Sequence, residues 1–218
     1  MSTATDSPTR IRQLPPLVVN QIAAGEVVDR PASVVKELID NALDAKARRI
    51  TVELEQGGIE LVRITDDGTG IGGDDLPLAI APHATSKIRS AEDLDHIATM
   101  GFRGEALASI ASVSRLSLRS RTAADAGAHQ IDIEGDTAGP VKPAAGPVGT
   151  SVSVRNLFFN TPARRKFLRT PSTEQGHCVD MALDLAMSHP AIGFSVLCDG
   201  RRALEVPQDQ SPRQRVPA

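Results

Sequence analysis

The chain has no tryptophan and no tyrosine, and 5 phenylalanines are its only large aromatic side chains in 218 residues. Proteins that bind single-stranded nucleic acid without sequence preference stack the bases on aromatic side chains. An excess of positive charge is also missing, because 24 lysines and arginines face 27 acidic residues and give a net charge of −3. The composition therefore disfavours a single-strand binder, and any contact with nucleic acid has to come from a local basic patch.

Long hydrophobic runs and a set of cysteines are missing as well. Mean hydropathy is −0.14, and no apolar stretch approaches the roughly 18 residues that a membrane-spanning helix needs. The two cysteines, Cys178 and Cys198, fit free, reduced thiols better than a disulfide scaffold or a zinc site. Residues 1–12 are polar, with no apolar stretch after their charges, so we expect no signal peptide, no membrane anchor and a cytoplasmic protein.

The patterning of the chain predicts one large domain with loose ends. Residues 1–10 are rich in Ser and Thr, show no hydrophobic periodicity and are expected to form a disordered arm. Periodic apolar patterns cover residues 11–206, which is enough chain for a substantial core. From Pro207 onward the composition changes to Gln, Pro and Arg.

Apolar residues at three- and four-residue steps predict several helices. Weaker patterns occur over residues 17–28 and 105–113. The strongest helix opens at Asp29-Arg30-Pro31, with an acidic cap and a proline in its first turn. Ser172-Thr173-Glu174-Gln175 has the spacing of a capping box, so we expect the last helix to start there and to end near Ser188.

Alternation of apolar and polar residues predicts strands that come mainly as hairpins. A first hairpin is expected at 50–54 and 59–65 around a two-residue Gly57-Gly58 turn, and a last one at 192–197 and 203–206. Single strands are expected at 116–118, 131–133 and 152–154, with a Gly- and Pro-rich connection at 135–149. Since βαβ alternation is absent, we predict an α+β fold, a two-layer sandwich whose mixed, mostly antiparallel sheet carries helices on one face.

Glu37 and Asn41 are one helical turn apart on the strongest predicted helix, so their side chains share a face. A carboxylate in this position can deprotonate a water molecule, and the neighbouring amide oxygen suits a hard cation such as Mg²⁺. A solvated polar helix face has the same pattern. This pair therefore needs support from other parts of the chain.

Asp66 follows a predicted strand and precedes glycines at alternate positions, Gly68 and Gly70. Glycines allow positive φ and let the backbone approach a flat ligand, while a buried carboxylate accepts a hydrogen bond from an exocyclic amine. A tight loop or a weak calcium site would use similar residues. The later glutamate of an EF-hand loop is absent, which disfavours calcium.

A glycine-flanked turn at residues 101–107 leads directly into a predicted helix. Backbone N–H groups at such a helix start, together with the helix dipole, suit phosphate groups. Residues 83–87 add hydroxyl groups and an ammonium group that suit a polyphosphate. A packing turn is the alternative, and neither the Walker-A nor the G-x-G-x-x-G pattern is present.

These segments, in this order along the chain, resemble the superfamily of ATPases that contains gyrase, a heat-shock chaperone, histidine kinases and MutL. The stretches at 20–28, 30–38, 101–107 and 159–168 look specifically like the MutL family of DNA mismatch repair proteins. The resemblance covers residues 11–206 and implies a Bergerat-type ATP-binding fold. A histidine kinase would need a phosphoacceptor domain that this chain lacks.

The resemblance implies a role for each candidate residue. Glu37 would be the general base that activates water for attack on the γ-phosphate of ATP, Asn41 would bind Mg²⁺, and Asp66 would accept the adenine amine, assisted by Thr150. Gly68 and Gly70 would shape the adenine pocket. A lid that orders when ATP binds would wrap the phosphates, and its residues would be Thr85, Ser86, Lys87, Gly101, Phe102, Arg103, Gly104, Glu105, Ala106 and Leu107.

Two positions and the end of the chain depart from the family pattern. Asp67 stands where the family commonly has Asn and is expected to add charge near the pocket, and Pro82 stands where a basic residue is expected. The family supplies a lysine to the γ-phosphate from a following subdomain, yet no lysine occurs after Lys166. The chain therefore looks truncated, and we expect residues 207–218 to be a linker or the start of that subdomain.

The resemblance also implies partners. ATP-driven lid ordering and homodimerisation would couple a mismatch-recognition protein to a downstream repair nuclease or helicase. DNA is expected to contact a basic patch free of acidic residues, although a solvated face used in subunit packing, or a non-catalytic DNA-binding scaffold, would look similar. The patch consists of Arg155, Arg164, Arg165, Lys166 and Arg169.

Overall fold

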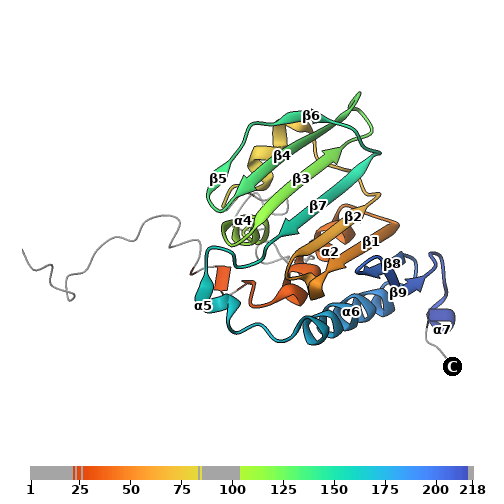
Figure 1. The fold of residues 1–218 in the computed structure, drawn as a ribbon. Helices are drawn as coiled ribbons and strands as arrows, with labels where there is room; N and C mark the ends of the chain where they lie inside the picture. The colour runs from red at the N-terminus through yellow and green to blue at the C-terminus, as the bar shows by residue number, and fades with distance from the viewer. Residues whose placement is uncertain (1–21, 23, 26, 83, 85–103, 216–218) are drawn as a thin grey trace, which may run out of the picture.

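A computed structural model of the chain describes residues 22, 24, 25, 27–82, 84 and 104–215. The described part is a single nine-stranded sheet with helices packed against it (Figure 1). The strands are β1 (Arg49–Glu55), β2 (Leu61–Asp66), β3 (Arg115–Arg121), β4 (Ala128–Glu134), β5 (Thr137–Ala138), β6 (Lys142–Ala144), β7 (Gly149–Arg155), β8 (Gly193–Cys198) and β9 (Arg201–Val206). The helices are α2 (Pro31–Asp44), α3 (Leu76–Ala79), α4 (Ala106–Ser112), α5 (Pro162–Arg165), α6 (Pro171–Ser188) and α7 (Pro212–Arg215), with 3-10 turns η1 (Gln56–Gly58) and η2 (Gly73–Asp75).

The strand order is β5-β4-β3-β7-β2-β1-β8-β9, and β6 pairs with β4. Strands β1 and β8 run parallel, while the other paired strands of the described sheet run antiparallel. The prediction of a mixed, mostly antiparallel sheet is therefore confirmed.

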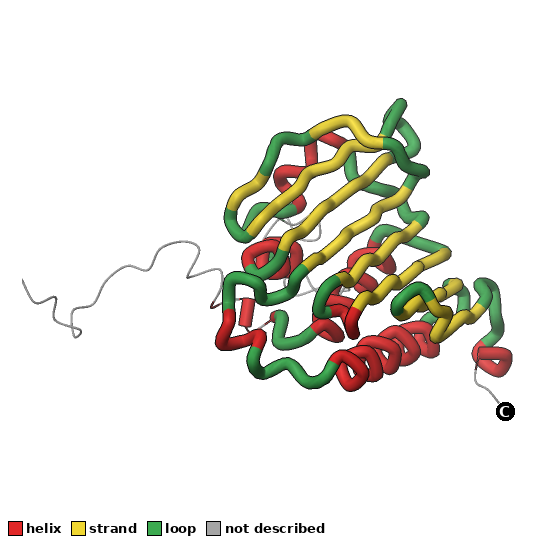
Figure 2. The backbone as a smooth tube through the Cα atoms, in the orientation of Figure 1, coloured by secondary structure: helices red, strands yellow, loops and turns green. Residues whose placement is uncertain are grey.

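The sheet has an apolar inner face and a polar outer face. Along β1 the buried residues Ile50, Val52 and Leu54 alternate with Thr51 and Glu53, as the period of two requires. Figure 2 shows the helices gathered on one side of the sheet, where α2 packs against α6 and against β1 and β2, and α4 packs against β3 and β4. The predicted two-layer sandwich with helices on one face is confirmed.

The first hairpin forms as predicted, but its connection is longer than two residues. The turn η1 is followed by Ile59 and Glu60 before β2 begins, and both Gln56 and Gly57 have positive φ, 49° and 67°. A Cβ atom on Gly57 would lie 2.2 Å from the carbonyl oxygen of Pro171. The glycine therefore allows both the positive φ of the turn and the close approach of α6 to it.

The start of α6 differs from the predicted capping box by two residues. Thr170 is the N-cap, its hydroxyl oxygen accepts from the N–H of Thr173 at 3.4 Å, and the buried Glu174 carboxylate accepts from the N–H of Arg169 at 2.8 Å. Pro171 occupies the first helical position, for which its fixed φ is suited. The expected Ser172–Gln175 box is therefore wrong, because the proline sets the helix start earlier.

The predicted acidic cap of α2 is also absent. The N-cap residue is Arg30, which makes no side-chain cap hydrogen bond, and Pro31 is in the first turn as expected. The carboxylate of Asp29 instead accepts a hydrogen bond from the hydroxyl of Ser33.

The Gly- and Pro-rich connection at 135–149 contains two short strands that were not predicted. Both β5 and β6 pair with β4, and Pro143 lies within β6. Proline is tolerated there because β6 is an edge strand. Edge position, and not local sequence preference, thus explains why sequence patterning misses these strands.

Other expectations concern the chain ends and the cysteines. The predicted arm at 1–10 lies outside the described residues, whereas part of 207–218 packs on the domain through Arg215, whose Nη2 donates to the carbonyl groups of Pro190 and Ile192, each at 2.6 Å. Both cysteines are free and buried, and burial raises the pKa of the Cys178 thiol to about 12. In the described part of the chain no helix is long and apolar enough to cross a membrane.

The observed cap of α6 gives a direct test. Thr170→Ala removes the oxygen that accepts from Thr173 and is expected to lower the free energy of unfolding by about 1 kcal/mol. Ser172→Ala is the matched control and is expected to change it by less than about 0.5 kcal/mol. Urea denaturation of both variants measures the difference, and a larger loss in Ser172→Ala would contradict this cap assignment.

Candidate functional site

The site is built on one row of residues across three neighbouring strands. In the register of β2, β7 and β3, Asp66 stands opposite Thr150, and Thr150 stands opposite Ser120. The next row toward the core, Ile64, Val152 and Leu118, is apolar. Side chains alternate between the two faces of a strand, and all six residues fall on the same alternate positions as the buried residues, so both rows face the helices.

A cavity of about 880 Å³ opens over these two rows. Asp66 and Thr150 line one side of it, and the apolar row forms its floor. The helix α2 contributes Asn41, and the residues after β2 contribute the Thr69–Gly72 loop. A cavity of this size, mainly apolar with a few converging polar groups, is typical of a small-ligand site.

Asp66 is the buried acid of the site. Asp66 is 9% exposed, and its Oδ1 accepts from the N–H of Gly68 at 2.8 Å. Burial raises the pKa of Asp66 to about 6, although hydrogen bonds from the backbone of Gly68 and Thr150 act in the opposite direction. At pH 7 the group is therefore an ionised acceptor held at an energetic cost.

The two predicted glycines let the loop after Asp66 press against its surroundings. A Cβ atom on Gly68 would lie 2.6 Å from the carbonyl oxygen of Ala45, just after α2, and one on Gly70 would lie 2.0 Å from that of Arg121. Gly70 also has a φ of 74°, and the N–H of Thr69 donates to the Ala45 carbonyl at 2.9 Å. Side chains at these two positions would push the loop out of place.

Asp67 adds charge near the cavity, as expected, because its charge helps to raise the pKa of Asp66, but Asp67 is not among the cavity-lining residues. Its Oδ1 accepts from the N–H groups of Arg48 and Arg49 at 2.7 and 2.8 Å, and its Oδ2 accepts from Arg49 Nε at 3.0 Å. Burial acts to raise the pKa of Asp67, but these hydrogen bonds outweigh it and lower the pKa below its usual value. Asp67 thus fastens the loop that contains Gly68 and Gly70 to the start of β1.

The two residues of the predicted catalytic pair differ in their position relative to the cavity. Asn41 lines the cavity, whereas Glu37, one turn earlier on α2, is not among the residues described as lining it. The Glu37 side chain is 22% exposed and has one oxygen 3.9 Å from Lys36 Nζ, which also binds Asp40 at 2.8 Å. Asn41 is therefore placed to contact a ligand, and Glu37 lies one turn farther along the same helix face.

The predicted lid is described only in part. Gly104, Glu105, Ala106 and Leu107 line the cavity at the start of α4, and a Cβ atom on Gly104 would lie 2.4 Å from the carbonyl oxygen of Ala84. Pro82 is described and exposed. The remaining predicted lid residues lie outside the described residues, and they are Thr85, Ser86, Lys87, Gly101, Phe102 and Arg103.

Two residues of the site were missed from the sequence. A Cβ atom on Gly149 would lie 2.1 Å from the carbonyl oxygen of Asp66, and its φ is 119°, so β7 reaches Asp66 only with glycine there. Ser120 is 2% exposed and lies beneath Thr150. The alternation of Leu116 and Leu118 extends to position 120, which is the signal that would have found Ser120.

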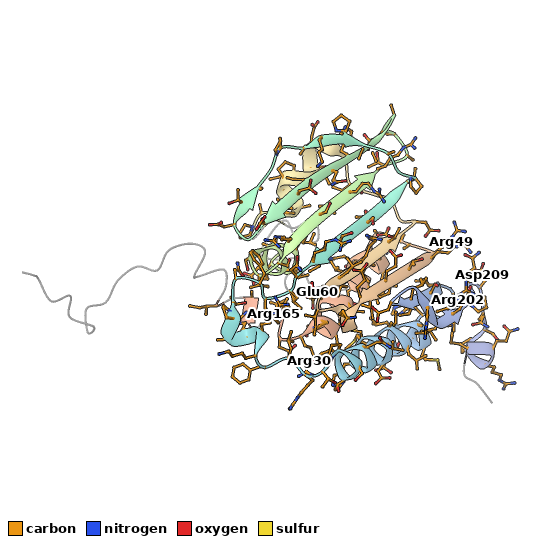
Figure 3. All side chains as sticks on the ribbon, in the orientation of Figure 1. Arg30, Arg49, Glu60, Arg165, Arg202 and Asp209 are labelled. Atoms are coloured by element: carbon orange, nitrogen blue, oxygen red, sulfur yellow. The ribbon has the colours of Figure 1, made fainter. Side chains whose placement is uncertain are left out.

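The basic patch is less uniform than its sequence indicates. Arg155 and Arg165 pair with Glu55 and Glu60 at 3.7 and 3.1 Å, and Figure 3 shows Arg165 beside Glu60. The guanidinium group of Arg164 packs over Gly25, where a Cβ atom would meet it at 2.1 Å. The remaining two members, Lys166 and Arg169, are exposed and make no ion pair within the described part of the chain.

Comparison with known proteins assigns the chain to a family. A profile of the family described as histidine kinase-, DNA gyrase B- and HSP90-like ATPase matches residues 29–144. The ATPase domain of Aquifex aeolicus MutL, solved in complex with ADP, superposes with a TM-score of 0.69 at 34% identity, covering 87% of this chain and 68% of that one. This chain belongs to the MutL family.

Sequence comparison agrees with this assignment to MutL. The DNA mismatch repair protein MutL of Azotobacter vinelandii is 57% identical over 211 residues, which are 95% of this chain and 33% of that protein. MutL of Pseudomonas putida strain GB-1 is 55% identical over 210 residues. The chain thus spans about a third of the length of these MutL relatives and corresponds to their ATPase region.

The opposite environments of Asp66 and Asp67 predict opposite pH dependences. Because the pKa of Asp66 is raised from 3.8 to about 6, its contribution to stability is present below pH 4 and lost as pH rises through about 6. Because one pKa unit corresponds to about 1.36 kcal/mol, this shift lowers the free energy of unfolding at neutral pH by about 3 kcal/mol. Asp66→Asn is therefore expected to raise the free energy of unfolding at pH 7. The gain is reduced by the weaker hydrogen bonds that a neutral amide accepts from the backbone.

The matched control is Asp67→Asn. The lowered pKa of Asp67 contributes stability at neutral pH that is lost as pH falls below its ordinary value of 3.8 and through the lower value of the folded state. This variant should therefore be less stable than the wild type at pH 7. Urea unfolding between about pH 2 and pH 8 covers both transitions, and parallel profiles for the two variants would refute the assigned environments.

Proposed function

We propose that the chain is the ATP-binding and ATP-hydrolysing module of a mismatch-repair switch. The observation that carries this proposal is the row of Asp66 and Thr150 above an apolar floor, with Asn41 in the same cavity of about 880 Å³. An ionised carboxylate accepts from the amino group of adenine, and the apolar floor suits the flat purine ring. The ADP bound to the ATPase domain of Aquifex aeolicus MutL supports this choice of ligand.

Residues of this chain also suit a magnesium ion. Mg²⁺ takes few protein ligands and completes its shell with water and substrate phosphates. Among the described residues no group of three or more His, Cys, Asp or Glu side chains is arranged to hold a metal. The amide oxygen of Asn41 would therefore hold the ion together with nucleotide phosphates, and the ion would neutralise phosphate charge during transfer.

Glu37 would act on water. Its carboxylate is on the helix face that carries Asn41, one turn away, so a general base there would lie beside the phosphate end of a nucleotide whose base contacts Asp66. The backbone around Gly104 to Leu107 lines the cavity and would hold the phosphates.

Substitutions on α2 separate binding from turnover. Glu37→Ala is expected to keep nucleotide affinity and to reduce ATP hydrolysis by roughly 10²- to 10⁴-fold, because only the general base is lost. Asn41→Ala is expected to lose the part of nucleotide affinity that depends on Mg²⁺. Ser33→Ala, one turn before Glu37 on the same helix, is the control for nonspecific damage to α2. Normal turnover in Glu37→Ala would move the water-activating role to another residue.

The switch function rests on the MutL family. We propose that ATP orders the lid, that the ordered lid promotes homodimerisation, and that the dimer couples a mismatch-recognition protein to a downstream repair enzyme. A ligand does this only if it binds the ordered state better than the open one. The part of the lid at Gly104 lies on the cavity wall, which supports direct contact between lid and nucleotide.

A DNA contact through the basic patch is a second proposal. Lys166 and Arg169 are its exposed members without an acidic partner in the described structure, so they are the residues free to meet phosphates. Arg155 and Arg165 would first have to leave Glu55 and Glu60.

Charge reversal tests the DNA contact. The double variant Lys166→Glu/Arg169→Glu is expected to weaken binding of double-stranded DNA and to reduce the slope of log affinity against log salt by roughly 1 to 2. Arg201→Glu/Arg202→Glu, on β9, makes the same change in net charge and should leave the slope unaltered. Equal effects of the two double variants would mean that the patch makes no specific contact.

A further inference from the structure

Ser120 lies beside Thr150 in the row of Asp66, Thr150 and Ser120, and it makes three polar contacts. Its Oγ is 3.0 Å from the carbonyl oxygen of Gly149 and 2.9 Å from Thr150 Oγ1, and it accepts from the N–H of Ile71 at 2.8 Å. The residue is 2% exposed, so water does not replace these partners. A buried hydroxyl with three partners has little freedom to rotate.

The number of protons fixes the direction of each bond. A serine hydroxyl has one proton to donate, and a carbonyl oxygen accepts only. If all three contacts are satisfied together, Ser120 donates to Gly149 and Thr150 donates to Ser120. The proton of the Thr150 hydroxyl is then directed away from the cavity, and its oxygen lone pairs remain for a ligand.

The edge of the cavity then consists of acceptors alone. Asp66 is a carboxylate, and Thr150 offers only lone pairs to the cavity that both residues line. A 6-aminopurine presents an N–H donor at this edge, whereas a 6-oxopurine presents an oxygen acceptor that would face two acceptors. Burying an unmatched polar group is costly, so such an edge discriminates between the two bases.

We propose that Ser120 is a positioning residue that sets the polarity of Thr150 and so gives the site its preference for 6-aminopurine over 6-oxopurine nucleotides. This proposal rests on the proposed nucleotide site. Ser120 touches no ligand itself, because it is covered by Thr150 and by the loop at Ile71. Without its oxygen, the Thr150 hydroxyl is free to turn its proton into the cavity and to donate to a 6-oxo group.

The experiment compares ADP with inosine diphosphate, which has a 6-oxo group in place of the 6-amino group. Isothermal titration of the purified chain gives the ratio of the two dissociation constants. We expect the wild type to favour ADP and Ser120→Ala to reduce this ratio by about fivefold, mainly through tighter binding of inosine diphosphate. Ser120→Thr keeps a hydroxyl group and should restore the ratio.

Two further variants separate this role from a general loss of structure. Ser114→Ala removes another buried serine hydroxyl, which donates to the carbonyl oxygen of Ile110 at 2.7 Å. Ser114 does not line the cavity, so this variant should leave the ratio unchanged. Thr150→Val should itself reduce the ratio, and adding Ser120→Ala to it should have no further effect on the ratio. Should Ser120→Ala not fold, Ser120→Cys is expected to reduce the ratio, because a thiol is a weak hydrogen-bond partner.

The outcomes distinguish this inference from the function on which it rests. A wild type that binds neither nucleotide would overturn both. A wild type that prefers ADP, with an unchanged ratio in Ser120→Ala, would overturn the role of Ser120 and leave the nucleotide site standing. An equal loss of affinity for both nucleotides would show that Ser120 only holds the loop at Ile71, and would also overturn the proposal.

Discussion

The pairing register of β2, β7 and β3 is the constraint on which the site depends. It places Asp66, Thr150 and Ser120 in one row and the apolar floor in the next, and a shift of one residue would turn both rows to the outer face. Gly149 holds this register, since a side chain there would collide with the Asp66 carbonyl. The loop glycines and α2 then close the cavity around an arrangement that the sheet has already fixed.

The folded environment of Asp66 disfavours its charge. Burial of its carboxylate raises the pKa to about 6, so the folded chain at neutral pH carries a charge that it would hold more easily in water. Neighbouring Asp67 is in the opposite situation, because the Arg49 guanidinium group compensates its charge and the backbone N–H groups of Arg48 and Arg49 donate to it, which fixes the loop. Two adjacent acids of identical chemistry thus differ in place, since Asp66 lines the cavity and Asp67 anchors the loop, and their environments alone separate them.

Much of the fold could be predicted from local patterns. Alternation predicted β1, β2, β3, β4, β7 and the last hairpin of β8 and β9. Residue type and resemblance pointed to Asn41, Asp66 and Gly70, which the structure places on the cavity wall, and to Glu37, whose role stays a prediction. Features that depend on tertiary contact were missed or wrong: the cap at Thr170, which Pro171 displaces, the edge strand β6, which only pairing with β4 defines, and the orientation of Asp67 toward Arg49. Ser120 was missed because its role lies in hydrogen bonds to segments distant in sequence.

The parallel pairing of β1 with β8 has a consequence for the order of folding. These strands are separated by most of the described chain, so their pairing requires closure of a long loop, whereas β1 with β2 and β3 with β4 are close in sequence. Strands β8 and β9 contribute no residue to the cavity wall. The cavity-lining strands β2, β7 and β3 pair with one another and with β1 and β4, so their pairing does not require the closure of the long loop between β1 and β8.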